Sequence, residues 1–74
     1  MSRLPTVKPR EIIKVLLKLG FVERKGRGSH RVYRHPTTNR MVVVPVHPGD
    51  LKPNLVKEII KQAGLTEEEF RELL

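Results

Sequence analysis

The spacing of the apolar residues changes along the chain, and this change constrains the fold more than any other feature of the sequence. From residue 12 to residue 19 the apolar side chains fall on one arc of a helical wheel, and the polar side chains take the opposite arc. The run of valines between residues 40 and 46 is typical of a strand instead. Helical spacing returns between residues 55 and 63. The chain is therefore expected to form an α+β fold with strands between helices.

Prolines, glycines and a capping motif mark the ends of the expected helices. Pro9 suits the first helical turn, where its missing N–H costs nothing, and Gly20 suits the left-handed residue just past a helix end. Thr66 and Glu69 form a capping box, which marks the start of a last, short helix. These signals place three helices, at about Pro9–Leu19, Pro53–Ala63 and Glu67–Leu74.

Three strands are expected between the first two helices. Turn-forming residues separate them: the flexible connection Gly26–Ser29 lies between the first two strands, and the Pro36–Asn39 turn lies between the last two. Such short connections predict an antiparallel meander. The expected strands are Phe21–Lys25, His30–His35 and Arg40–Val46.

The third strand carries apolar residues on both of its faces. Its even-numbered valines lie on one side, and Met41 and Val43 lie on the other, so only one set can enter the core. The outward set is either a surface that a partner covers or an ordinary apolar patch. Pro45 cannot donate to a ladder of hydrogen bonds, so the strand lies at a sheet edge or ends at this proline.

At 74 residues the chain is expected to form one domain, residues 1–74, with little apolar material to line a deep cavity. Chemistry on such a protein takes place at the surface, which favours a large substrate over a small buried one. No cysteine is present, which excludes disulfides, thiolate metal sites and cysteine nucleophiles, and no cofactor is expected. Neither a membrane span nor a signal peptide is apparent, so we expect a soluble, cytoplasmic protein.

Basic residues are concentrated in the first two thirds of the chain. Residues 1–50 contain eleven Lys and Arg against three acidic residues, whereas the rest of the chain contains four basic and five acidic residues. In a chain of net charge +7, an excess this localised favours a polyanion such as nucleic acid as the partner. The alternative is a basic domain with no role in nucleic-acid binding.

His30 is the side chain best placed to act as an acid or base near neutral pH. It lies in a run of basic residues, with no acidic residue between Glu23 and Asp50. The neighbouring cations disfavour a protonated imidazole and attract phosphate, which suits a general base in metal-independent RNA cleavage. A histidine that only hydrogen-bonds its neighbours in the strand is the alternative. Around His30 as the candidate catalytic residue, the candidate RNA-binding residues are Arg24, Lys25, Arg27, Gly28, Ser29, Arg31 and Arg34.

The other titratable residues give weaker signals. His35 and His47 each precede a proline, where histidine commonly has a structural role in a turn. The spacing of the three histidines matches no common zinc-ligand pattern, and the carboxylates form neither a catalytic pair nor a magnesium site, so no metal site is expected. Tyr33 is expected to lie half-buried in the sheet, with base stacking as the alternative.

Short motifs are spread along nearly the whole chain, and their order and spacing are specific together although no one of them is decisive. They are Leu4-Pro5 before the first helix, Leu19-Gly20-Phe21 at its end, Gly28-Ser29-His30, Val44-Pro45-Val46-His47, and Lys61-Gln62-Ala63-Gly64-Leu65 followed by Glu69-Phe70. On these motifs the chain resembles the HicA (YcfA-type) mRNA interferase toxins of toxin–antitoxin modules.

The resemblance implies a double-stranded-RNA-binding-domain-like fold, the order of helix, three-stranded antiparallel sheet and helix that the periodicity predicts separately, here with a short C-terminal helix. It also implies metal-independent cleavage of mRNA with His30 as the essential histidine, and a HicB-type antitoxin that covers this residue. The proton donor for the leaving 5′ oxygen is open among water, His30 itself, Tyr33 and Lys25. Two other functions stay open: a non-catalytic RNA-binding module that uses the same basic face, and a protein-interaction domain that docks through its apolar strand.

Overall fold

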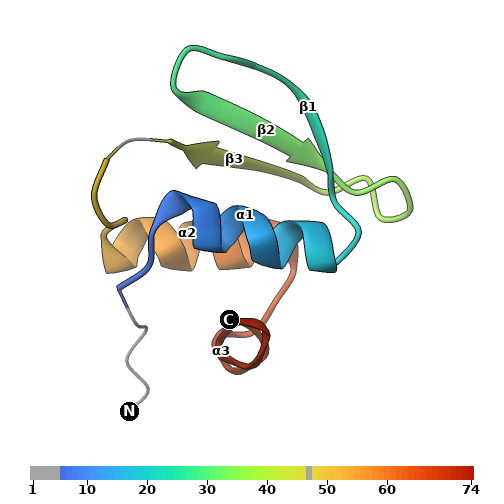
Figure 1. Ribbon diagram of the computed structural model, residues 1–74. Helices are drawn as coiled ribbons and strands as arrows, with labels where there is room; N and C mark the ends of the chain where they lie inside the picture. Colours follow the sequence, from blue (N-terminus) through green and yellow to red (C-terminus); the bar gives the residue numbers. More distant parts are fainter. Residues whose placement is uncertain (1–5, 47) are drawn as a thin grey trace.

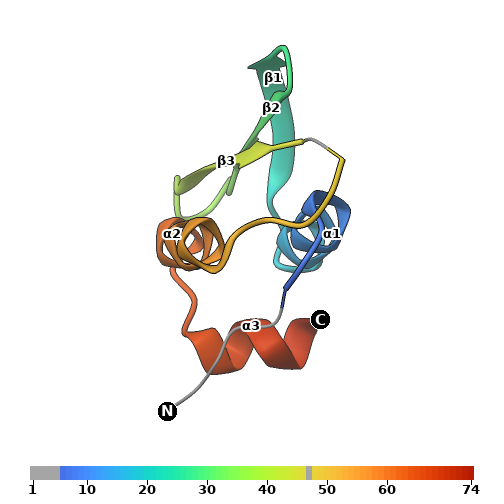
Figure 2. The same ribbon diagram turned by 90° about the vertical axis from the view of Figure 1, so that its left-hand side faces the viewer.

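The protein is built in layers, with an antiparallel sheet above a pair of helices and a third helix beneath the pair (Figure 1 and Figure 2). The computed structural model describes residues 6–46 and 48–74. The elements are α1 (Pro9–Lys18), β1 (Val22–Arg27), β2 (His30–Arg34), β3 (Met41–Pro45), α2 (Pro53–Ala63) and α3 (Glu67–Leu73). This order confirms the expected α+β architecture, a double-stranded-RNA-binding-domain-like fold with an added C-terminal helix.

The expected helix ends agree with the structure to within a residue. Gly20 has a φ of +97°, and this left-handed residue ends α1, because the N–H groups of Gly20 and Phe21 turn back to the carbonyl oxygens of Leu17 and Leu16 at 3.1 and 3.0 Å. Gly64, with a φ of 78°, ends α2. The capping box at α3 is formed: the Thr66 hydroxyl accepts from the Glu69 N–H at 3.1 Å, and the Glu69 carboxylate accepts from the Thr66 N–H at 2.9 Å.

Apolar side chains from the sheet and the helices meet in one core. Tyr33, Val42 and Val44 come from the sheet, and at most 1% of each remains exposed. The helices supply Ile12, Val15, Leu16, Val56, Ile59, Ile60 and Phe70. Truncating such a buried side chain typically costs about 2–5 kcal/mol of unfolding free energy. The core therefore fixes one face of the sheet against the helices and leaves the other face open (Figure 1).

The hairpin between β1 and β2 differs from the prediction. Gly26 and Arg27 belong to β1, so the connection is only Gly28 and Ser29. A bulge between Arg24 and Arg27 sets two residues of β1, Lys25 and Gly26, opposite the single residue Arg31 of β2. Gly26 is needed there because a Cβ at this position would collide with the backbone carbonyl of His30. The glycines that predicted a flexible loop instead allow a tight hairpin.

The third strand is shorter than predicted and lies at a sheet edge. The strand order is β1-β2-β3, and β3 runs from Met41 to Pro45, so Arg40 and Val46 lie outside it. Both alternatives expected for Pro45 are confirmed: β3 is an edge strand, and Pro45 is its last residue. The N–H of Val43 donates to Oε1 of Gln62 on α2 at 3.4 Å.

Candidate nucleic-acid interface

The strand register divides the sheet residues between two faces. Residues that pair directly across antiparallel strands lie on the same face. Tyr33 pairs with Val42, and these buried residues define the inner face toward the helices. His30, Val32 and Arg34 alternate with them and lie on the outer face. Their cross-strand partners complete this outer face, which comprises Val22, Arg24, Arg27, His30, Val32, Arg34, Met41, Val43 and Pro45.

His30 is the first residue of β2 and is exposed. It pairs with Arg27 of β1 on one side and with Pro45 of β3 on the other. The carbonyl oxygen of the preceding residue, Ser29, accepts a hydrogen bond from the N–H of Val46 at 2.6 Å. The backbone at His30 is thus held from both neighbouring strands, while its imidazole is accessible to a large substrate.

Basic residues of β1 lie on the strand next to His30, and Arg24 and Arg27 share its face. Arg24, Lys25 and Arg27 are all exposed, and none has an ion-pair or side-chain hydrogen-bond partner within residues 6–46 and 48–74. Their charges are therefore available to a phosphate group. Arg34 lies at the other end of β2, where its guanidinium donates to Oδ1 of Asn39, from Nε at 2.8 Å and from Nη2.

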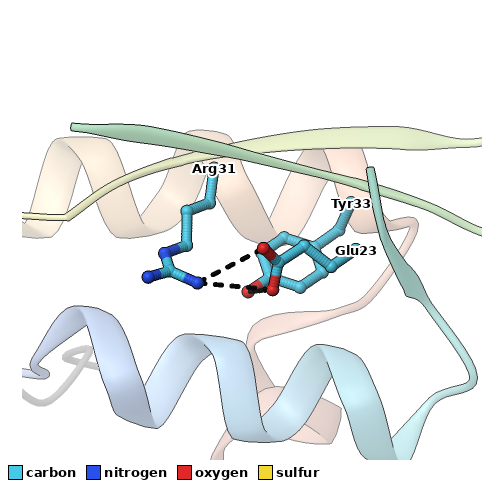
Figure 3. Close-up of polar contacts among 3 residues, drawn as sticks. All are labelled: Glu23, Arg31 and Tyr33. Atoms are coloured by element: carbon cyan, nitrogen blue, oxygen red, sulfur yellow. Dashed lines mark hydrogen bonds and ion pairs between the residues drawn. The ribbon is translucent and has the colours of Figure 1, made fainter. Parts of the chain in front are cut away.

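The structure does not bring Arg31 together with His30. Arg31 lies on the inner side of the sheet, where its Nη1 forms an ion pair with Oε2 of Glu23 at 3.3 Å. Figure 3 shows both side chains, with Tyr33, on the side of the sheet that faces α1. Successive side chains in a strand point to opposite faces, so the side chains of His30 and Arg31 lie on opposite sides of the sheet although the residues are adjacent in sequence.

Tyr33 is more deeply buried than expected. Only 1% of it is exposed, and its hydroxyl donates to Oε1 of Glu23 at 3.4 Å. Burial raises the pKa of Tyr33 above its usual 10.0, and the negative charge of Glu23 raises it further. A buried, protonated tyrosine on the inner face can neither stack on a base at the outer face nor donate a proton there.

His35 has the structural role that its place before Pro36 predicted. Its Nδ1 accepts from the N–H groups of Thr37 and Thr38, each at 3.2 Å, and its Nε2 lies 3.0 Å from the carbonyl oxygen of Leu19. Because Nδ1 accepts twice, the proton is on Nε2, which donates to Leu19. The ring thus ties the β2–β3 turn to the end of α1.

Three further expectations concern His47, metal ligands and membrane-spanning helices. His47, expected in a turn, lies outside the described residues. Within the described part of the chain, no group of three or more His, Cys, Asp and Glu side chains could hold a metal ion. No helix among the described residues is long and apolar enough to cross a membrane.

The outer face also carries apolar side chains. Val22, Met41 and Val43 are 52%, 55% and 40% exposed, so the expected division of β3 into a buried and an exposed set is confirmed. These residues share the face with His30, Arg24 and Arg27 by register. Val43 lies in the same cross-strand row as Arg24, so a molecule that covers Val43 would lie against Arg24 as well.

Two residues of the site have roles that the sequence did not reveal. Gly26 provides the close approach of β1 to the His30 carbonyl, although its position beside Gly28 pointed to a loop. Glu23 neutralises Arg31 across the hairpin. Glu23 alternates with Val22 and Arg24 along β1, and this alternation could have placed its side chain on the inner face if the alignment of β1 with β2 had been known.

Comparison with known proteins assigns most of the chain to one family. The sequence model of the family described as HicA toxin of bacterial toxin–antitoxin matches residues 9–65. This match begins at the first residue of α1 and ends just after α2, so it includes the whole sheet. A comparison with the curated proteins found no match.

Proposed function

The chain belongs to the HicA toxin family of bacterial toxin–antitoxin modules, and from this membership we propose that it is an endoribonuclease that cleaves mRNA without a metal ion. In this proposal residues 1–74 form a single domain, His30 is the general base, and no cofactor takes part. An mRNA substrate places the activity in the cytoplasm.

The observation that carries the proposal is the position of His30 on an open face beside unpaired cations. Arg24, Lys25 and Arg27 lie on the neighbouring strand, and no acidic side chain of the described residues is paired with them. His30 accepts the proton of a ribose 2′-OH, and the 2′ oxygen then attacks the adjacent phosphorus. The bond from phosphorus to the 5′ oxygen breaks, which yields a 2′,3′-cyclic phosphate and a 5′-OH end.

The cations supply the electrostatic part of this reaction. Arg24 and Arg27 stabilise the negative charge that develops on the phosphate oxygens, and Gly28 and Ser29 let the RNA backbone approach the hairpin. Arg34 contacts the RNA at the far end of β2, and Arg31 contributes less because Glu23 offsets its charge. Tyr33 is buried on the inner face, so the proton donor for the 5′ oxygen is water, Lys25 or His30 itself.

The family implies an antitoxin partner, and we assign this partner to the outer face as a HicB-type protein. Exposed Met41 and Val43 provide an apolar surface on the same face as His30, so burying them would also block the base. Replacing Val43 by glutamate should weaken the complex, because the charge must be desolvated. Val43→Ser, which removes apolar area without adding negative charge to this face, should also weaken the complex and keep RNA cleavage.

Incubation of the protein with a long single-stranded RNA in excess EDTA tests the proposal. The wild type should cleave the RNA, and His30→Ala should leave it intact while keeping the native circular dichroism spectrum. Lys57→Ala, which removes an exposed charge on α2, is the matched control and should cleave normally. Cleavage by His30→Ala at the wild-type rate would refute the role of His30.

A further inference from the structure

A depression in the surface lies beside the hairpin that carries His30. Its volume is about 430 Å³, within the range of about 300–1,000 Å³ that is usual for small-molecule sites. Residues far apart in the sequence line it, from the start of α1 and from positions 46 and 48–50 after β3. The lining residues that matter here are Lys8, Pro9, Arg10, Val46, Pro48 and Asp50.

Backbone hydrogen bonds join this depression to the candidate catalytic strand. Val46, one of the lining residues, donates its N–H to the carbonyl of Ser29 at 2.6 Å, and Ser29 directly precedes His30. Leu51, which follows Asp50, donates its N–H to the carbonyl of Val7 at 2.7 Å, and Val7 directly precedes Lys8, so a backbone bond also joins the two lining segments. Figure 2 looks onto this end of the molecule, with the hairpin tip above and the first turns of α1 and α2 beneath.

The lining combines the chemical groups that a nucleotide needs. The exposed cations of Lys8 and Arg10 suit a phosphate, and neither side chain has an ion-pair partner among the residues described. Pro9 and Val46 are the apolar residues of the lining and can contact a base. The carboxylate of Asp50 can accept a hydrogen bond from an amino group, as carboxylates do from N4 of cytosine.

We propose that this depression binds a nucleotide close to the one that is cleaved at His30, where the RNA passes from the outer face round the end of the edge strand β3, with its base unpaired. The inference rests on the proposed function, since it needs RNA at the hairpin. A base can reach these apolar lining residues only when it is out of a duplex stack, so the site selects single-stranded RNA. Asp50 favours a base that carries an exocyclic amino group over uracil, which lacks one.

Binding measurements on paired variants test this proposal. In a His30→Ala background, which prevents cleavage, the affinity for a short single-stranded RNA is measured over a series of salt concentrations. Lys8→Gln with Arg10→Gln should weaken binding roughly ten-fold and reduce the salt slope by about 0.7 for each phosphate that the protein no longer neutralises. The matched control, Lys57→Gln with Lys61→Gln, removes the same charge from exposed positions on α2 and should change the affinity by less than about two-fold.

A second variant tests the base preference without changing the cations. At the neighbouring nucleotide, the full chain in the same background should bind RNA with cytosine at least about five-fold more tightly than RNA with uracil. Asp50→Ala should abolish this difference. Asp50 is exposed, so its truncation leaves the core intact.

The outcomes separate this inference from the proposed function. Equal weakening by both charge pairs, or tighter binding to a duplex of the same sequence, would overturn the nucleotide site while leaving His30 chemistry intact. A preference for cytosine that survives Asp50→Ala would overturn the role of the carboxylate. Failure of the wild type to bind or cleave any RNA would instead overturn the proposed function, and the site with it.

Discussion

Arg31 follows His30 directly in β2, yet the two residues lie on opposite faces of the sheet. His30 shares the outer face with Arg24 and Arg27, whereas Arg31 is paired with Glu23 on the side toward α1 (Figure 3). The basic run of the hairpin is therefore two separate sets of charges. Only the set on the outer face can act on a phosphate that also reaches the imidazole.

Neutralising these two sets should have different effects on RNA binding. Arg27→Gln should weaken binding to all RNA sequences and lower the salt slope by about one unit, because it removes a phosphate contact. Arg31→Gln removes the same charge from the opposite face and should change the slope by clearly less. Fluorescence anisotropy over a salt series measures both slopes, and equal slopes in the two variants would contradict the assignment of faces.

Gly26 should be intolerant of a side chain. A Cβ at Gly26 would collide with the His30 carbonyl, and both groups are backbone, so the hairpin must shift. Gly26→Ala should cost about 1–3 kcal/mol of unfolding free energy and slow RNA cleavage by roughly 10- to 100-fold. Gly28→Ala is the control for stability: no atom lies within 4 Å of its added Cβ, so only the left-handed backbone costs about 1–2 kcal/mol. Wild-type activity and stability in Gly26→Ala would refute the close approach.

Replacing His30 of β2 and replacing His35 of the following turn should have different effects on the free energy of unfolding. His35→Ala removes an imidazole that bonds to Leu19, Thr37 and Thr38, and should lower the unfolding free energy by about 2–3 kcal/mol. His30→Ala removes an exposed side chain and should change it by less than about 0.5 kcal/mol. Urea unfolding of both variants provides the comparison, and a larger loss in His30→Ala would contradict the structural assignment.

Tyr33→Phe should retain RNA cleavage and change the dependence of stability on high pH. Burial raises the pKa of Tyr33 in the folded protein above the value of 10.0 expected when the chain unfolds. The folded state then holds the proton more tightly, so stability is fully present below pH 10 and falls as the pH rises through the raised pKa. Urea unfolding at neutral and alkaline pH should show a steeper fall for the wild type than for Tyr33→Phe. Identical curves, or loss of cleavage in the variant, would argue against a buried, non-catalytic tyrosine.

Most of the fold could be predicted because its signals are local. Pro9, Gly20 and Gly64 act through their own backbone geometry, and the Thr66–Glu69 capping box spans a single helical turn. The error at Gly26 has a tertiary cause. Two glycines in close succession are typical of a loop, but the approach of the neighbouring strand decided that the first of them lies in a bulged strand.

The candidate site could be predicted in composition but not in arrangement. The basic run and its histidine are contiguous in the sequence, so their presence was evident. The pairing of Arg31 with Glu23 depends on the hairpin register, which the bulge shifts. The depression beside the hairpin joins Lys8 and Arg10 to Asp50, about forty residues away, and no local pattern connects them.

The central claim is that His30 directs attack by the 2′-OH on the adjacent phosphate without a metal ion, and the chemical ends of the RNA products test it most directly. After digestion in excess EDTA, mass spectrometry should find 2′,3′-cyclic phosphate and 5′-OH ends with the wild type, and no such products with folded His30→Ala. Products with 3′-OH and 5′-phosphate ends would contradict the account, because they require attack by water instead of the ribose hydroxyl.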